Sequence, residues 1–133
     1  MRIFIDTNVL IDVLEKRIPF YLYSANVLNL GATGEHELYA TPLSLVNCIY
    51  ICRKSQGYEK ALDSIKQVRR IVRVAPMSEA EFDTALSCMG SDLEDNLQYA
   101  SALASSCDVI VTRNKEDYKF SDIPVLTPRE LMG

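Results

Sequence analysis

The chain has 133 residues, a length that suits one domain, residues 1–133, with a single hydrophobic core. Its 48% hydrophobic and 24% charged residues are typical of a globular protein, and it has neither an apolar run of membrane-spanning length nor a signal-peptide pattern, so we expect a cytoplasmic protein without membrane association. The formal net charge of −4 argues against a general polyanion-binding module, which would carry a basic face.

The N-terminal stretch combines a buried strand with an acidic turn. Residues 2–5 are an apolar β-type run, and Asp6 stands between this run and the helical spacing of residues 7–15. In open α/β sheets, ligands bind outside the carboxyl ends of the strands, so Asp6 occupies a position suited to a site. Asp, Thr and Asn also favour helix N-caps, and the run Asp6-Thr7-Asn8 fits capping as well as it fits catalysis.

The rest of the chain alternates helices with strands. Periodicity, capping residues and Gly or Pro breaks predict helices over residues 20–30, 42–54, 58–70, 78–89 and 91–106, and a closing helical turn over 127–130. Strands are predicted over residues 37–41, 71–75, 109–111 and 125–126. This order predicts an α/β fold, a parallel sheet with helices on both faces, and the mostly apolar helix 42–54 is expected to be central and buried.

A second group of acids lies at the start of helix 91–106. With Ser91 as the N-cap in a capping box with Glu94, Asp92 and Asp95 lie three residues apart on one face. Acids in a first helical turn interact favourably with the helix dipole, which accounts for Asp92 and Glu94. Asp95 lies a full turn into the helix, so the dipole explains it less well.

A third polar segment, residues 112–117, directly follows the buried strand 109–111. If the predicted topology is right, this segment, Asp6 and Asp95 meet at one edge of the sheet. Carboxylates so close repel one another, and Mg²⁺, which prefers oxygen ligands, would relieve the repulsion and could act on a phosphodiester. Spacing alone leaves open both a metal-dependent phosphoryl enzyme and a structural role.

No competing catalytic motif is found. The sequence lacks both a Gly-x-Ser-x-Gly motif and a Gly-rich phosphate loop. Its four cysteines include no Cys-x-x-Cys pair, and His36 is the single histidine, so a zinc site is not expected.

Three segments together resemble the PIN domain, and most closely the VapC-type toxin ribonucleases of toxin–antitoxin pairs. They are Ile-Asp-Thr-Asn-Val-Leu-Ile-Asp at 5–12, Asp-Leu-Glu-Asp-Asn-Leu-Gln-Tyr-Ala-Ser-Ala-Leu at 92–103, and Asp-Val-Ile-Val-Thr-Arg-Asn-Lys-Glu-Asp-Tyr at 108–118. The resemblance implies a three-layer α/β/α sandwich with a short, mostly parallel sheet, Mg²⁺- or Mn²⁺-dependent endonuclease activity on RNA, a homodimer and a small antitoxin partner.

The resemblance also implies roles for individual residues. Asp6 matches the first metal ligand and Asp95 the acid on the later helix, while the last acid falls on Asp117 or on Asn114, where many members have Asp. Asp117 is the candidate we carry forward as a catalytic and metal-binding residue. Supporting polar groups would be Thr7, Asn8, Asn47, Asp92, Thr112 and Asn114, and Arg113 and Lys115 would hold substrate phosphate.

One departure from the family pattern bears on activity. Members usually carry a Glu on the helix that here spans 42–54, and this chain has Asn47 after Ser44-Leu-Val, with no acid in the helix. Asn can hydrogen bond but brings no charge. The alternative hypothesis is therefore a catalytically weakened module that binds RNA or protein. A phosphoacceptor domain of the response-regulator type fits less well, because no second strand ends in a lone acceptor Asp.

Overall fold

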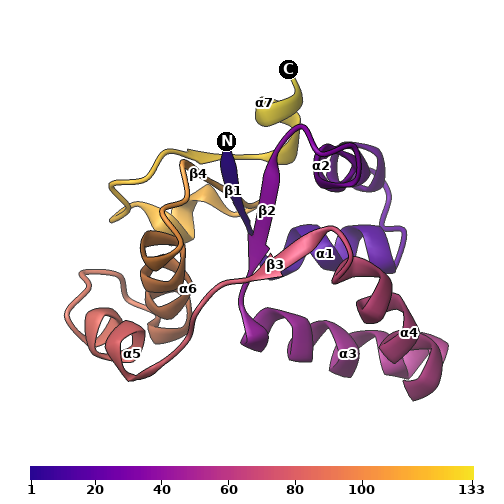
Figure 1. Ribbon diagram of the computed structural model, residues 1–133, viewed down its shortest axis with the longest axis horizontal. Helices are drawn as coiled ribbons and strands as arrows, with labels where there is room; N and C mark the ends of the chain where they lie inside the picture. The colour runs from indigo at the N-terminus through magenta and orange to yellow at the C-terminus, as the bar shows by residue number, and fades with distance from the viewer.

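The computed structural model describes residues 1–133 and is built on a five-stranded sheet of order β3-β2-β1-β4-β5 (Figure 1). All of its strand pairs are parallel. The strands are β1 (Arg2–Ile5), β2 (Glu37–Ala40), β3 (Val72–Val74), β4 (Val109–Val111) and β5 (Val125–Leu126). The helices are α1 (Thr7–Leu14), α2 (Tyr21–Ala32), α3 (Pro42–Gln56), α4 (Tyr58–Val68), α5 (Glu79–Leu86), α6 (Leu93–Ala104) and α7 (Pro128–Met132), with the 3₁₀ turn η1 (Lys115–Tyr118).

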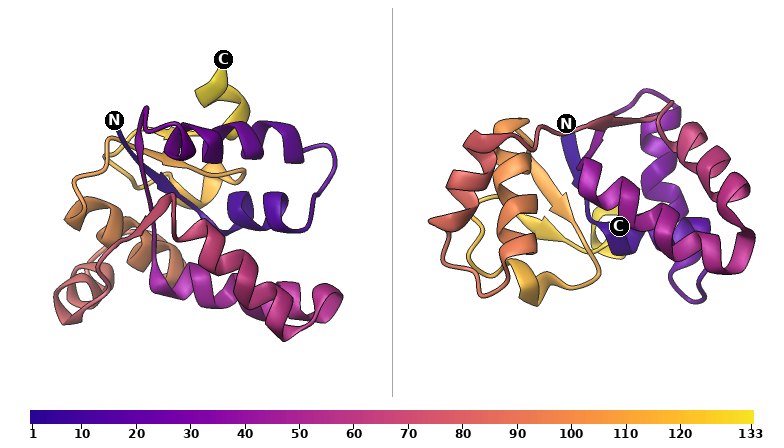
Figure 2. Two further views of the ribbon diagram at one scale, coloured as in Figure 1. Left: turned by 45° about the vertical axis from the view of Figure 1, so that its right-hand side comes forward. Right: turned by 90° about the horizontal axis from the view of Figure 1, so that it is seen from below.

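The three layers follow from the alternation of side chains along β1. Ile3 and Ile5 point to one face and join the larger core, which α1, α2, α3 and α4 complete. Phe4 points to the other face and packs in a second core with Tyr99 of α6 and Tyr118 of η1. Figures 1 and 2 show the helices separated in this way on the two sides of the sheet. The predicted α/β/α sandwich with a parallel sheet is confirmed.

Two local predictions were wrong. The helix predicted over residues 20–30 does not end before Gly31, which lies inside α2, where a Cβ atom would come within 2.7 Å of Leu38 Cδ1 and 2.8 Å of the Ile71 carbonyl oxygen. Because glycine has no side chain, it allows α2 to approach the sheet closely at this point. The N-cap of α6 is Asp92 rather than Ser91, and the Asp92 side chain accepts a hydrogen bond from the Asp95 backbone N–H at 3.1 Å. Glu94 therefore takes part in no capping box.

Helix α3 is less buried than its composition predicted. Ser44, Leu45, Cys48 and Cys52 face inward, while the apolar side chains of Val46, Tyr50 and Ile51 are exposed. The expectation of a central, buried helix was thus wrong, because α3 covers one end of the sheet with a single face only. None of the seven α-helices has the length and apolar character needed to cross a membrane.

Candidate functional site

Asp6 lies at the carboxyl end of the central strand and caps α1. Its Oδ1 accepts a hydrogen bond from the Thr7 backbone N–H at 2.7 Å, as the capping interpretation predicted. The cap explains only part of its surroundings, because the residue is 92% buried and accepts three further bonds from side chains. A helix cap at a protein surface needs none of these.

Three side-chain donors hold the Asp6 carboxylate. The Thr112 hydroxyl donates to Oδ2 at 2.8 Å, and the Asn8 amide donates to the same oxygen at 3.3 Å. The Gln98 amide donates to Oδ1 at 3.3 Å. Burial raises the pKa of Asp6, and the hydrogen bonds from Thr112, Thr7 and Gln98 oppose that rise. No lysine or arginine pairs with this carboxylate.

Asp95 faces the same edge of the sheet from the first turn of α6. Burial raises its pKa to about 7, and the negative charges of Asp92, Asp6, Asp117 and Glu94 add to the rise in that order. Asp92, Asp95 and Asp117 also line one cavity of about 490 Å³. Two of the three predicted segments therefore share a cavity, whereas Asp6 does not line it and is linked to Asp95 through its charge. No three acidic, histidine or cysteine side chains are gathered closely enough to hold a metal as they stand.

The crowding around Asp95 predicts a pH dependence of stability. Its pKa in the folded, metal-free protein is about 7 against an ordinary 3.8, so the folded state binds the proton more tightly and loses stability as pH rises through this range. The Asp95→Asn variant cannot ionise, and we expect it to exceed the wild type in free energy of unfolding at about pH 8 but not at about pH 4. Urea titrations in EDTA measure both differences; equal differences at the two pH values would contradict the crowding.

Tyr118 contributes a buried hydroxyl beside the Asp6 carboxylate. The side chain is 1% exposed, and its hydroxyl forms no short hydrogen bond, although it is close enough to Asp6 to oppose the rise in the pKa of that carboxyl. Burial raises its pKa above the usual range, with added effects from the charges of Asp6, Asp95 and Asp117. Native structures rarely leave such a group unsatisfied. This hydroxyl is therefore placed to donate to the Asp6 carboxylate, or to water bound beside it.

These residues fit a hard divalent cation. The donor set consists of carboxylate oxygens without lysine or arginine partners, and Mg²⁺ and Mn²⁺ prefer such oxygen ligands. Asp6 and Asp95 would hold the ion, with Asp117 close by. The two long bonds that Asp6 accepts, from Asn8 and Gln98 at 3.3 Å each, are the ones a cation could replace at least cost.

Replacing Tyr118 by Phe tests whether its hydroxyl is orphaned. A buried polar group without a partner costs about 1–3 kcal/mol, so Tyr118→Phe should keep or raise the free energy of unfolding of the metal-free protein. The matched control is Tyr99→Phe in the same core, which removes the hydrogen bond from the Asp122 backbone N–H to the Tyr99 hydroxyl and should destabilise by about 1 kcal/mol. Urea unfolding measures both, and an equal loss in the two variants would show that the Tyr118 hydroxyl is satisfied.

The other sequence-predicted polar residues divide into two groups. Thr7 exchanges a hydrogen bond with Ser44 at 2.6 Å, and Asn8 accepts one from the Arg113 backbone N–H at 3.1 Å, so both brace the Asp6 turn. Asn47 lies one turn beyond Ser44 and donates to Glu94 at 3.3 Å. By contrast, Asn114 is exposed and contributes its backbone N–H to Thr112, while two acids of the same segment, Glu116 and Asp117, line the cavity.

The two cations expected to hold phosphate are engaged elsewhere. Arg113 Nε donates to the fully buried Asp12 at 2.7 Å, and its guanidinium stacks 4.0 Å from the Phe20 ring centroid. Lys115 pairs with Glu130 at 3.1 Å. Neither Arg113 nor Lys115 forms an ion pair with Asp6 or Asp95. The structure therefore does not place these two cations at the acidic site.

Sequence reasoning missed Gln98. It is 2% exposed and connects three residues at the carboxyl edge: it donates to Asp6 and to Ser44, and accepts from Thr41. The available signal was its position three residues after Asp95, because a long polar side chain on the inner half of a helix must find partners in the core.

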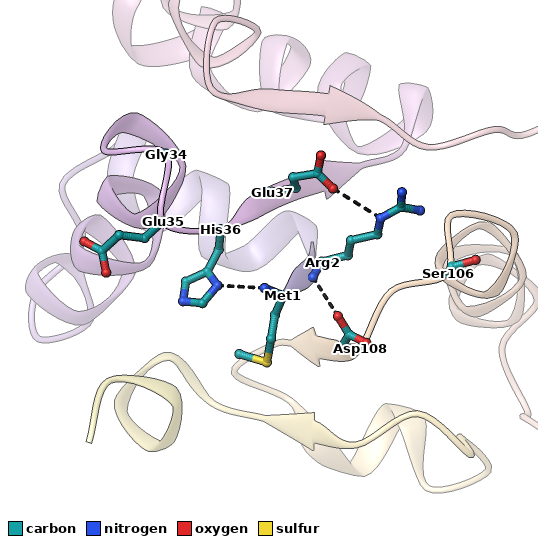
Figure 3. A pocket seen from close by; sticks show the side chains of 8 residues that line it. All are labelled: Met1, Arg2, Gly34, Glu35, His36, Glu37, Ser106 and Asp108. Carbon is teal, nitrogen blue, oxygen red and sulfur yellow. Dashed lines mark hydrogen bonds and ion pairs between the residues drawn. The ribbon is translucent and has the colours of Figure 1, made fainter.

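A separate hollow of about 370 Å³ lies at the opposite, amino-terminal edge of the sheet (Figure 3). The Met1 ammonium contacts His36 Nδ1 at 3.0 Å, and the Arg2 backbone N–H and side chain bond Asp108 and Glu37. The charged groups of this hollow pair with one another. His36, the single histidine, therefore has a structural partner here and needs no catalytic role. The functional interpretation therefore rests on the other edge.

Comparisons with known proteins agree with this geometry. The family model of the PIN domain matches residues 2–116. Ribonuclease VapC1 of Aquifex aeolicus (strain VF5) is 31% identical over 134 residues, which cover 97% of this chain and 92% of that protein. The structure of VapBC-1 from nontypeable Haemophilus influenzae matches with a TM-score of 0.71 at 17% identity, over 97% of this chain and 99% of that one. Mycobacterium tuberculosis VapC20, titled a Sarcin-Ricin loop cleaving toxin, matches with a TM-score of 0.63 at 12% identity, over 81% and 86%.

Proposed function

The chain belongs to the PIN domain family, and from this we propose that it is a metal-dependent endoribonuclease, the toxin of a toxin–antitoxin pair. The observation that supports the proposal is that Asp6 and Asp95 both lie at the carboxyl edge of the sheet, close enough for the charge of Asp6 to raise the pKa of Asp95, and that neither forms an ion pair with a lysine or arginine. The 31% identity to a protein named Ribonuclease VapC1 supports RNA as the substrate class.

The chain's own residues prepare the site for a cation and a phosphodiester. The short hydrogen bonds from the Thr7 backbone N–H and the Thr112 hydroxyl fix the Asp6 carboxylate so that its orientation does not depend on the ligand. Asp95 and Asp117 border the adjoining cavity, where RNA could enter. A divalent cation held there would activate water and stabilise negative charge on the phosphodiester. Tyr118 offers a further hydroxyl donor beside the Asp6 carboxylate.

RNA cleavage tests the proposal directly. The purified protein is incubated with structured RNAs, and with DNA of the same sequences, in Mg²⁺, Mn²⁺ or EDTA. We expect cleavage of RNA in the presence of either cation and none in EDTA. Cleavage that persists in EDTA would rule out the metal-dependent mechanism, and a preference for DNA would contradict the substrate class.

The alternative is a non-cleaving module that binds RNA or protein. The observation that favours it is Asn47, since α3 carries no acid where the family usually has Glu. Calorimetric titration separates the two hypotheses: the module requires no divalent-cation binding at millimolar concentrations, whereas the nuclease requires saturable binding.

We also propose a small antitoxin as a partner, and a homodimer as the assembly. Solved structures with the same fold include toxin–antitoxin complexes such as VapBC-1 of Haemophilus influenzae. The exposed apolar side chains of Val46, Tyr50 and Ile51 on α3, with Leu22 on α2, offer surface for such contacts. Light scattering of the protein alone and with the product of an adjacent short gene measures both associations.

A further inference from the structure

A second cavity at the carboxyl edge of the sheet is basic and aromatic. It lies where the start of α2 meets α7, the helix that Figure 1 shows beside α2. Its volume of about 420 Å³ suits a small ligand or one unit of a larger one. No acidic side chain lines it, although the chain has a formal net charge of −4. Two arginines, two aromatic residues and two small hydroxyl residues line it: Arg113, Arg129, Phe20, Tyr23, Ser24 and Thr127.

The two arginines of this cavity lie against its aromatic rings. The Arg113 guanidinium is 4.0 Å from the Phe20 ring centroid, and its Nε donates to the fully buried Asp12 at 2.7 Å. Only this nitrogen of the guanidinium is hydrogen bonded, so Nη1 and Nη2 remain for a ligand. Arg129 is 5.6 Å from the Tyr23 ring centroid and forms no ion pair. Because Asp12 compensates the charge of Arg113, Arg129 supplies the uncompensated positive charge of the cavity.

The cavity is connected to Asp6 by two short paths. The Thr112 hydroxyl donates to Asp6 Oδ2 at 2.8 Å, and Arg113 is the next residue in the chain. The Arg113 backbone N–H donates to Asn8 at 3.1 Å, and the Asn8 amide donates to the same Asp6 oxygen. A nucleic-acid strand that passes over Asp6 can therefore reach the cavity with a neighbouring nucleotide.

Resting on the proposed function, we propose that this cavity binds a nucleotide of single-stranded RNA beside the cleaved bond. Arg129 and the free Nη groups of Arg113 would hold a phosphate, and the exposed Tyr23 ring would stack on a base. Aromatic rings and arginines together bind single-stranded RNA, because every base has a flat face and every nucleotide a negative charge. A nucleotide matches both features of the cavity, whereas an acidic side chain of a protein partner matches only the charge.

RNA binding in EDTA tests this inference without relying on cleavage. Fluorescence anisotropy of a short labelled single-stranded RNA gives the affinity of each variant at several salt concentrations. Arg129→Gln should reduce the slope of log affinity against log salt concentration by about 0.7, the value for one phosphate contact with a single strand. Tyr23→Leu should weaken binding by about 5-fold or more, as expected for the loss of one base–aromatic stack, and leave the slope unchanged.

Two substitutions outside the cavity are the matched controls. Arg53→Gln removes another exposed arginine that lies over a tyrosine ring, and it changes the net charge by the same amount. Tyr58→Leu removes another exposed tyrosine. Both should bind RNA like the wild type. The inference is overturned if Arg129→Gln keeps the salt slope of Arg53→Gln, if Tyr23→Leu keeps the affinity of Tyr58→Leu, or if the wild type does not bind the RNA.

Cleavage in Mn²⁺ separates this failure from that of the proposed function. A wild type that cleaves RNA while the two cavity variants bind like their controls would keep the nuclease and refute the cavity's role alone. A wild type that does not cleave would refute the nuclease, and the binding data would still decide whether the cavity holds RNA. If Arg129→Gln binds RNA normally but loses affinity for the product of an adjacent short gene, the cavity serves a protein partner and the inference is overturned.

Discussion

Asp6→Asn and Asp95→Asn are each expected to lower RNA cleavage by at least about 100-fold, since even groups that only support metal ligands change activity by about 10–100-fold when removed. Asn keeps the size of each side chain but removes the charge that attracts a cation, and at position 6 its NH2 group also replaces one of the two oxygens that accept hydrogen bonds. Initial rates on a labelled structured RNA in Mn²⁺ measure the loss.

The control for this prediction is Asp63→Asn, on the exposed face of α4 far along the chain from the three acidic segments. It should cleave at the wild-type rate. Circular dichroism of all three variants checks that they fold. If Asp6→Asn and Asp95→Asn retain cleavage similar to that of Asp63→Asn, the residues do not form the active site.

Arg113→Ala is expected to reduce the free energy of unfolding by about 3–5 kcal/mol, the range observed when one partner of a buried ion pair is removed. Asp12 is fully buried, and its Oδ2 depends on Arg113 Nε at 2.7 Å, with a longer bond from the Ser24 hydroxyl at 3.3 Å. Its Oδ1 has no partner at all. Losing the guanidinium would also remove its packing on Phe20.

Lys115→Ala is the matched control, because the Lys115–Glu130 pair is solvent-exposed and such pairs contribute about 0–1 kcal/mol. Urea unfolding of both variants gives the comparison. Arg113→Ala combined with Asp12→Asn should regain part of the lost stability, since the uncompensated charge is gone. A stable Arg113→Ala protein with weakened RNA affinity would instead favour the phosphate-binding role that the sequence suggested.

The layered fold could be predicted from the sequence because the patterns that indicate each strand and helix are local. The run Ile3-Phe4-Ile5 has no polar face, which requires helices on both sides of the sheet, and the structure has them. The sequence could not predict whether Ser91 or Asp92 caps α6, because both residue types are good N-caps. The cap is identified only by the hydrogen bond that the Asp95 N–H donates to Asp92.

The site could be predicted in part, because some of its residues also follow from local patterns. Asp6 and Asp95 follow from strand ends and helix turns, and the topology brings them to one edge. Gln98 and the pairing of Arg113 with Asp12 depend on contacts between residues 92 and 101 positions apart in the sequence, which no local pattern specifies. The Asn47–Glu94 contact likewise joins residues 47 positions apart.

Crystals of the protein soaked in Mn²⁺ and measured for anomalous scattering test most directly whether these acids share one ion. We expect a single strong peak between Asp6 and Asp95, with carboxylate oxygens at about 2.1 Å, the distance typical of octahedral divalent ions of this size. A peak only at other places, or well-diffracting soaked crystals with no peak between these two residues, would contradict the metal site.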